Sequence, residues 1–237
     1  MALQNNKREH NKQANRAALI EAARQCFLDL GYEAVTVRDI IRASELAPGT
    51  FYNYFNDKEA LFREILETGI REITDHIHNL RHSSANIEAF IHGSYHALFS
   101  RIAAEPCFFE LILRNEHSVR SIFRETMLRI PMRTLKSDLQ DAMSRGIFPD
   151  LDIELLAASF YGVAFEVGRV MITRQNIDPD TATQFATKLL HGGLQALSMA
   201  SIQNRLAKRK GGDGEMAAND NITSRNETIT AINAIQT

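Results

Sequence analysis

The sequence predicts an all-α protein in two parts, a small three-helix head with a helix-turn-helix and a larger helical body. Apolar residues recur three and four positions apart through most of the chain, and we find no alternating strand pattern and no internal repeat. Short helices with capping residues occupy the N-terminal part, and longer helices follow. A length of 237 residues suits one small module and one larger helical body.

Composition divides the chain into four segments. Residues 1–14 are polar and basic and are expected to form a flexible arm, and residues 206–237 are polar and glycine-rich, which is typical of a disordered tail. Between them we expect a small helical domain at 15–70 and a larger helical domain at 71–205.

Capping residues predict the helix boundaries of the head. One apolar face predicts a helix over residues 16–30, which Gly31 ends in the left-handed conformation. Thr36 and Asp39 have the spacing of a capping box at the start of a second helix. After a four-residue turn, Pro48 suits the first position of a third helix, because proline has no amide hydrogen to lose there.

The third helix, which we expect to end near Phe55, combines an aromatic face with a small, hydrogen-bonding face. Phe51 and Phe55 point to one side, whereas Gly49, Thr50 and Asn53 point to the other. Gly49 allows close backbone approach to DNA, and Thr50 and Asn53 can contact base edges. Aromatic spacing alone is also typical of a core, but the preceding helices, the turn and the basic arm favour DNA binding.

Phosphate contacts are expected around this helix. Tyr52 and Tyr54 flank its polar face, and their hydroxyls can reach phosphates. Lys58 adds a positive charge at the start of a fourth, long helix that begins at Asn56–Asp57 and runs to about Leu80.

The string TVRDIIRASELAPGTFYNYFNDKEALF resembles the helix-turn-helix signature of the TetR repressor family, and the likeness runs from about Asn15 to Ile70. The resemblance implies a three-helix DNA-binding head, a helical ligand-binding body and a dimer. Glu45 stands where the family turn often has glycine, and Ala47 where a capping Ser or Thr is usual. The expected DNA-contacting residues are Thr36, Arg38, Pro48, Gly49, Thr50, Tyr52, Asn53, Tyr54 and Lys58.

Two or three helices are expected between Ile87 and Gly146, with breaks at Pro106, near Asn115 and, as a further candidate, at Pro131. Aromatic residues here and in the next helix predict an apolar effector pocket, although a packed core is the competing interpretation. The effector is expected to be aromatic or acyl with one polar or charged end. The expected lining is His96, Phe99, Phe108, Phe109, Tyr161 and Phe165.

Two apolar helices, at 152–174 and 178–201, are expected to dimerise the protein. Together they hold more apolar surface than one body can bury, and small residues among the large ones allow close helix approach. The competing interpretation is a monomer in which both helices are core. The expected interface residues are Gly162, Leu189, Gly193 and Leu197.

Charge and motifs limit the alternatives. A net charge of −2 argues against a general nucleic-acid coat protein but is compatible with a sequence-specific binder. The chain lacks the common catalytic motifs, so we expect no enzyme and no cofactor. His92 and His96 lie four apart without further ligands, so we expect no metal site. A helical adaptor that binds a protein through the same head, or a helical enzyme, remains as an alternative.

The remaining features indicate a cytoplasmic protein. Cys26 and Cys107 form no CxxC pair and are interpreted as buried thiols. We find neither a signal-peptide pattern nor an apolar run long enough to span a bilayer, so no membrane partner is expected. The function predicted from the sequence is a ligand-responsive repressor that binds a palindromic operator as a dimer.

Overall fold

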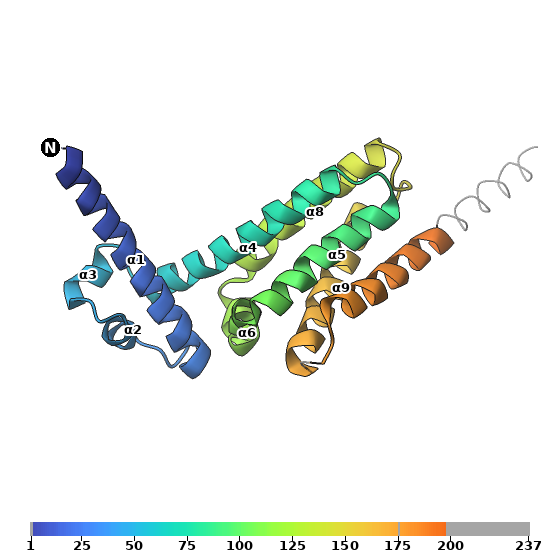
Figure 1. Ribbon diagram of the computed structural model, residues 1–237. Helices are drawn as coiled ribbons and strands as arrows, with labels where there is room; N and C mark the ends of the chain where they lie inside the picture. The colour runs from blue at the N-terminus through green and yellow to red at the C-terminus, as the bar shows by residue number, and fades with distance from the viewer. Residues whose placement is uncertain (1, 175, 198–237) are drawn as a thin grey trace, which may run out of the picture. The chain divides into compact units, whose positions relative to one another are not determined.

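The computed structural model describes residues 2–174 and 176–197, and all regular structure within these ranges is helical (Figure 1). The expected tail at 206–237 lies outside the described residues. Residues up to Leu190 form one compact unit, and the helical residues 191–197 belong to a second. The first unit therefore contains both the head and most of the body.

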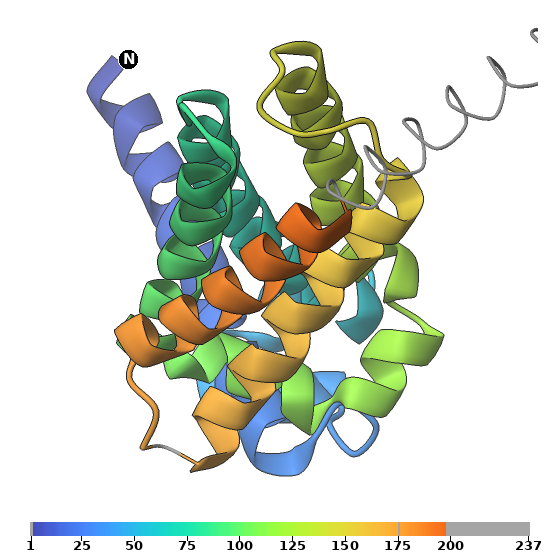
Figure 2. The ribbon, with the colours of Figure 1, turned by 90° about the vertical axis from the view of Figure 1, so that its right-hand side faces the viewer.

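The head consists of three helices, and a fourth connects it to the body: α1 (Ala2–Leu30), α2 (Val37–Ser44), α3 (Pro48–Tyr52) and α4 (Lys58–His82). The body continues with α5 (Ile87–Ala104), α6 (Pro106–Arg114), α7 (Glu116–Ser121), α8 (Arg124–Ser144) and α9 (Ile153–Arg174). A further helical segment covers residues 179–197. α4 packs against α8 and α5, and α9 packs against α5, α6 and α8 (Figures 1 and 2).

Local capping chemistry is found where the sequence predicts it. Gly31 has φ +83°, and its N–H donates to the Phe27 carbonyl at the end of α1. Thr36 and Asp39 form the reciprocal capping box of α2. The Asp57 carboxylate accepts a hydrogen bond from the Ala60 N–H and begins α4. These boundaries depend on residues three or four apart, so sequence suffices to predict them.

Several helix boundaries differ from the expectation. α1 begins at Ala2 rather than at residue 16, because no Gly or Pro interrupts a stretch rich in good helix formers. α3 ends at Tyr52, and the chain continues as a turn to Phe55. The breaks at Pro106 and Asn115 are confirmed, whereas Pro131 lies inside α8 and does not end it.

Head and body share one hydrophobic core. Leu111, Ile112, Val119 and Phe123 of the body belong to the same buried cluster as the apolar residues of α1 to α4. Edge-to-face aromatic contacts stabilise the junction between head and body, since the ring of Phe123 packs edge-on against Tyr32 and Phe62.

Hydrogen bonds from one buried side-chain amide also stabilise this junction. Asn115, between α6 and α7, accepts a hydrogen bond from the Tyr32 N–H. Its Nδ2 donates to the carbonyls of Phe27 and Leu111. The C-terminal end of α1 is therefore bonded directly to the end of α6.

Two expectations from the sequence are wrong, one about the burial of Cys107 and one about the longest apolar run. Cys107 is exposed, because α6 turns Phe108 and Phe109 inward and leaves its second residue on the surface. α9 is long and apolar enough to cross a membrane by length and composition, although the sequence suggested no such run. Since α9 packs against three body helices and carries the Arg169 ion pair with Glu116, we interpret it as a helix of the bundle.

Candidate DNA-binding face and effector cavity

α3 presents the surface that the sequence predicts for DNA. Phe51 is fully buried and Phe55 nearly so, and both belong to the head core. Gly49 and Asn53 are exposed on the other side, and Tyr52 is 63% exposed, which is unusual for an aromatic side chain. A Cβ atom added at Gly49 would meet no atom within 4 Å, so the protein itself does not require glycine there.

The start of α2 lies in the same head and is also exposed. The Thr36 hydroxyl donates to Asp39 Oδ2 at 2.6 Å and accepts from the Asp39 N–H. The hydrogen bonds from Thr36 lower the pKa of the Asp39 carboxyl below its usual value. Arg38 is exposed beside them. Thr50 and Tyr54 are half buried, and Pro48 is exposed.

Lys58 has a role within the protein that the sequence did not indicate. Its Nζ donates to the carbonyls of Tyr32, Glu33 and Val35 at 2.8, 3.3 and 2.9 Å. The ammonium also lies 4.5 Å from the centre of the Tyr32 ring. An ammonium has three N–H donors, so none is left for a phosphate in this arrangement.

The turn between α2 and α3 contains both departures from the TetR pattern. Glu45 has φ +56°, the left-handed conformation that favours glycine. Ala47 is the N-cap of α3 and supplies no side-chain hydrogen bond. Glu45 therefore adopts a backbone conformation that favours glycine, and Ala47 leaves the start of α3 without a side-chain cap.

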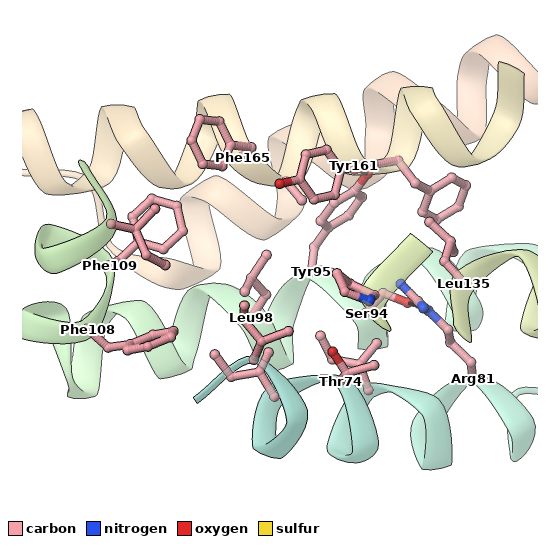
Figure 3. A pocket seen from close by; sticks show the side chains of 17 residues that line it. Thr74, Arg81, Ser94, Tyr95, Leu98, Phe108, Phe109, Leu135, Tyr161 and Phe165 are labelled. Atoms are coloured by element: carbon pink, nitrogen blue, oxygen red, sulfur yellow. Dashed lines mark hydrogen bonds between the residues drawn. The ribbon is translucent and has the colours of Figure 1, made fainter. Parts of the chain in front are cut away.

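An apolar cavity of about 140 Å³ lies between α4, α5, α6, α8 and α9 (Figure 3). Aromatic rings form much of its wall, and Ile70, Ile73 and Ile77 of α4 form one side. Four expected residues line it: Phe108, Phe109, Tyr161 and Phe165. The stacked rings of Tyr161 and Phe165 come from α9, with centroids 6.1 Å apart.

Two expected pocket residues do not line the cavity. Phe99 is completely buried and stacks on Tyr95 in the core. His96 is half exposed, with Nε2 lying 3.4 Å from Asp180 Oδ1. The reason is the rotation of α5, which turns Ser94, Tyr95 and Leu98 toward the cavity instead.

Sequence reasoning missed the main polar residue of the cavity. Arg81 reaches it from α4, donating from Nε to Ser94 Oγ at 2.8 Å and from Nη1 to Asp138 Oδ2 at 3.3 Å. The available signal was its register, because Arg81 continues the apolar stripe of α4 four residues after Ile77. Three other arginines of the body have partners outside the cavity: Arg101 pairs with Glu72 and Glu105, Arg114 with the Asp29 carbonyl, and Arg169 with Glu116.

Residues 19–65 match the family model described as bacterial regulatory proteins, tetR family. The protein is a transcriptional regulator of the TetR family. This TetR regulator is 26% identical over 172 residues to the HTH-type transcriptional repressor DhaR of Mycobacterium sp. (strain GP1), spanning 69% of the chain and 86% of the relative. It is 25% identical over 190 residues to the repressor KstR2 of Rhodococcus jostii (strain RHA1), spanning 76% and 92%.

Solved structures share the fold of this TetR regulator. The fatty acid degradation regulator FadR from Bacillus halodurans superposes with a TM-score of 0.67 at 23% identity, covering 76% of this chain and 96% of that one. FadR from Bacillus subtilis, in complex with stearoyl-CoA, has a TM-score of 0.64 at 19% identity, covering 73% and 96%. At these identities the likeness concerns the helical fold.

The residues expected at a dimer interface are all exposed in this single chain. In the first unit, Leu189 is 53% exposed, and a Cβ at Gly162 would meet no atom within 4 Å. In the second unit, Gly193 and Leu197 are likewise exposed. Two large apolar residues, Leu155 of α9 and Phe185 of the following helix, are also exposed.

Proposed function

We propose that this TetR regulator is a dimeric repressor whose operator affinity falls when a small apolar effector occupies the cavity beside α4. The observation that carries the proposal is the course of α4. This helix begins at Lys58, which is bonded to the loop after α1, and continues to Ile70 and Ile77 in the cavity wall. A displacement of α4 at the cavity therefore reaches the head directly.

A second route supports the same coupling. Phe108, Phe109 and Ile112 of α6 line the cavity, and α6 ends at Asn115, which is bonded to the end of α1. Because packed interiors respond to a ligand by discrete shifts, two helices that touch both sites can bias the orientation of the head. The effector must have a higher affinity for the conformation that does not fit the operator than for the conformation that does.

The DNA interface that we propose consists of α3 and the start of α2. Gly49 would approach the DNA backbone, Asn53 would contact bases, and Arg38 would contact phosphates. The two heads of a dimer would contact half-sites one helical turn apart, about 34–36 Å, in a palindromic operator. Operator DNA is cytoplasmic in bacteria, and we place the protein there.

Gly49→Ala separates DNA contact from folding. A methyl group at this position meets no protein atom, so the free energy of unfolding should not fall. It would occupy the space that the DNA backbone needs, so operator affinity should drop at least about tenfold, or ~1.4 kcal/mol. Gly93→Ala on α5 is the matched control, since its Cβ meets only Leu80 at 3.9 Å.

The assay is fluorescence anisotropy with labelled DNA from upstream of the gene, alongside chemical denaturation of both variants. Unchanged operator affinity for Gly49→Ala would remove α3 from the proposed interface. Equal losses for both glycine variants would point to a general effect of substitution.

Effector response is tested in the same anisotropy assay. Small apolar compounds should lower operator affinity in proportion to their occupancy of the cavity. Stearoyl-CoA, the ligand of the Bacillus subtilis FadR structure, is a natural first probe, but it is far larger than the present cavity. Thermal stabilisation without any loss of DNA affinity would mean that the cavity binds ligands but does not control the head.

The dimer proposal rests on the exposed apolar face of α9 and the following helix. Only 28% of the most apolar stretch of α9 is buried, although the helix is apolar enough for a membrane. Leu155, Gly162 and Leu189 lie on exposed faces that a second copy could cover. Gly162→Arg should produce a monomer in sedimentation, whereas Ala103→Arg on the exposed surface of α5 should leave the dimer intact. A wild-type monomer at micromolar concentration would refute the dimer.

A further inference from the structure

The polar groups of the cavity fall into two classes, those already bonded and those that are not. The Tyr95 hydroxyl donates to the Phe160 carbonyl at 3.1 Å. Ser94 Oγ donates to the Phe90 carbonyl and accepts from Arg81 Nε. These two lining residues are satisfied by the protein and require nothing from a ligand.

Three other groups have no partner among the described residues. The hydroxyls of Thr74 and Tyr161 form no hydrogen bond there, and Arg81 bonds through Nε and Nη1 but not through Nη2. Figure 3 shows Thr74 and Arg81 on one wall, contributed by α4, and Tyr161 on the opposite wall, contributed by α9. All three groups can donate a hydrogen bond, and a guanidinium N–H cannot accept one.

The cavity nevertheless carries no net charge for an anion. The Arg81 side chain is only 10% exposed and faces Asp138, whose side chain is 4% exposed. The other oxygen of Asp138 is bonded to Nδ1 of His78, which is half exposed. Burial lowers the pKa of Arg81, and the adjacent Asp138 carboxylate opposes that shift. A second carboxylate beside Asp138 would be a buried charge without its own counter-ion.

We propose that the cavity selects an uncharged, mainly apolar molecule with one carbonyl oxygen, a ketone or ester, which accepts a hydrogen bond from Arg81 Nη2. This inference rests on the proposed effector role of the cavity and specifies the ligand class. The size of the ligand follows from the volume. The cavity measures about 140 Å³, and an engineered apolar cavity of about 150 Å³ holds benzene. A single substituted ring or a short chain therefore fits.

Hydrogen-bond energetics distinguish this class from its neighbours. A pure hydrocarbon would fill the space but leave the Arg81 donor without a hydrogen-bond partner, which is unfavourable. A carbonyl oxygen satisfies that donor without adding charge. A hydrogen bond to a charged group is worth about 1.5–3 kcal/mol, which corresponds to about 10- to 100-fold in affinity.

Three ring compounds of equal non-hydrogen atom count and similar shape test the proposal: acetophenone, isopropylbenzene and benzoate. Their affinities for the full-length wild-type protein are measured by calorimetry near neutral pH. We expect acetophenone to bind at least about tenfold more tightly than isopropylbenzene, and benzoate to bind most weakly.

The outcomes separate this inference from the proposed function. If acetophenone and isopropylbenzene bind with equal affinity, the proposed hydrogen bond from Arg81 is refuted. If benzoate binds most tightly, the proposal of an uncharged ligand is refuted. Either result would leave the cavity as an effector site. No binding by any of the three would overturn both this inference and the effector cavity.

A paired substitution tests the assigned donor. Arg81→Met combined with Asp138→Leu removes both buried charges together, which proteins tolerate better than removal of one. This double variant should bind isopropylbenzene as the wild type does and should lose the preference for acetophenone. Tyr161→Phe, which removes a cavity hydroxyl without touching Arg81, is the control and should keep the preference. A preference retained by the double variant, or lost in Tyr161→Phe, would overturn the assignment to Arg81. The ligand series on the wild type decides the neutral class even if the double variant does not fold.

Discussion

Glu45→Gly should stabilise this TetR regulator, because Glu45 occupies a backbone conformation that suits glycine. Its φ of +56° and ψ of +16° lie in the left-handed region. Among the described residues its side chain forms no hydrogen bond or ion pair that the substitution would remove. The cost of this conformation for a residue with a Cβ is about 1–2 kcal/mol. Glycine loses about 0.5–1 kcal/mol more backbone entropy on folding than alanine does, so the net gain should be about 0.5–1 kcal/mol.

The measurement is thermal and chemical unfolding of the wild type, Glu45→Gly and Glu45→Ala. For a compact unit of this size a gain of about 1 kcal/mol raises Tm by about 2–4 °C. Glu45→Ala removes the same charge but keeps the Cβ, so it should give no comparable gain. If alanine and glycine stabilise equally, the effect is due to charge and the argument from backbone conformation is refuted. Ala47→Ser, two residues later, should add about 1 kcal/mol independently by supplying the missing cap of α3.

Three further predictions concern the packing around the head and the cavity. Lys58→Met keeps the aliphatic stem but removes three donors to carbonyls, so it should destabilise the protein by about 1.5–3 kcal/mol in chemical denaturation; an unchanged stability would return Lys58 to a purely DNA-contacting role. Gly69→Ala would place a Cβ 2.5 Å from the Phe108 ring, which must then move. Overpacking should cost about 1–3 kcal/mol, and calorimetry should show altered ligand affinity; no change in either would contradict the close contact. The hydrogen bond from Arg169 lowers the pKa of Glu116, so this pair stabilises the protein above the unfolded pKa of the glutamate, and the contribution is lost as pH falls through the lower folded pKa. The Tm difference between wild type and Glu116→Gln should therefore narrow on acidification, and a difference that stays constant would show that the pair does not act through this ionisation.

The head was predictable because its determinants are local. The capping box of Thr36 and Asp39, the left-handed Gly31 and the N-cap Asp57 each act within one helical turn. The buried side of α3 followed from the spacing of Phe51 and Phe55 in the same way. The contacts of Lys58 could not be predicted from local sequence, because its ammonium donates to carbonyls 23 to 26 residues away.

The cavity was predictable only in part, for the same physical reason. Large aromatic residues in the middle helices indicated a pocket, and those of α6 and α9 line it. The polar end depends on Arg81 meeting Asp138, which lies 57 residues later in the chain. Many carboxylates could have been its partner, and periodicity does not choose among them. His96 was misplaced because the rotation of α5 depends on its packing against α4 and α9.

The size of the cavity limits how a small effector could control the head. Moving a two-state equilibrium from 1:99 to 99:1 requires about 5.5 kcal/mol of differential binding. One hydrogen bond to Arg81 would supply about 1.5–3 kcal/mol, and burial of one ring in the aromatic wall about 1.5–3 kcal/mol. Together they supply about 3–6 kcal/mol, which meets the requirement only at the upper end, so nearly all of the binding energy must be specific to the ligand-bound conformation. The operator-binding conformation should therefore have the cavity closed or filled. Phe108 is suited to that change, because its ring lies against Gly69 of α4 and also forms part of the cavity wall. A modest movement of this ring would open the cavity and shift α4, which is bonded to the loop after α1, relative to α6, which is bonded to the end of α1 through Asn115.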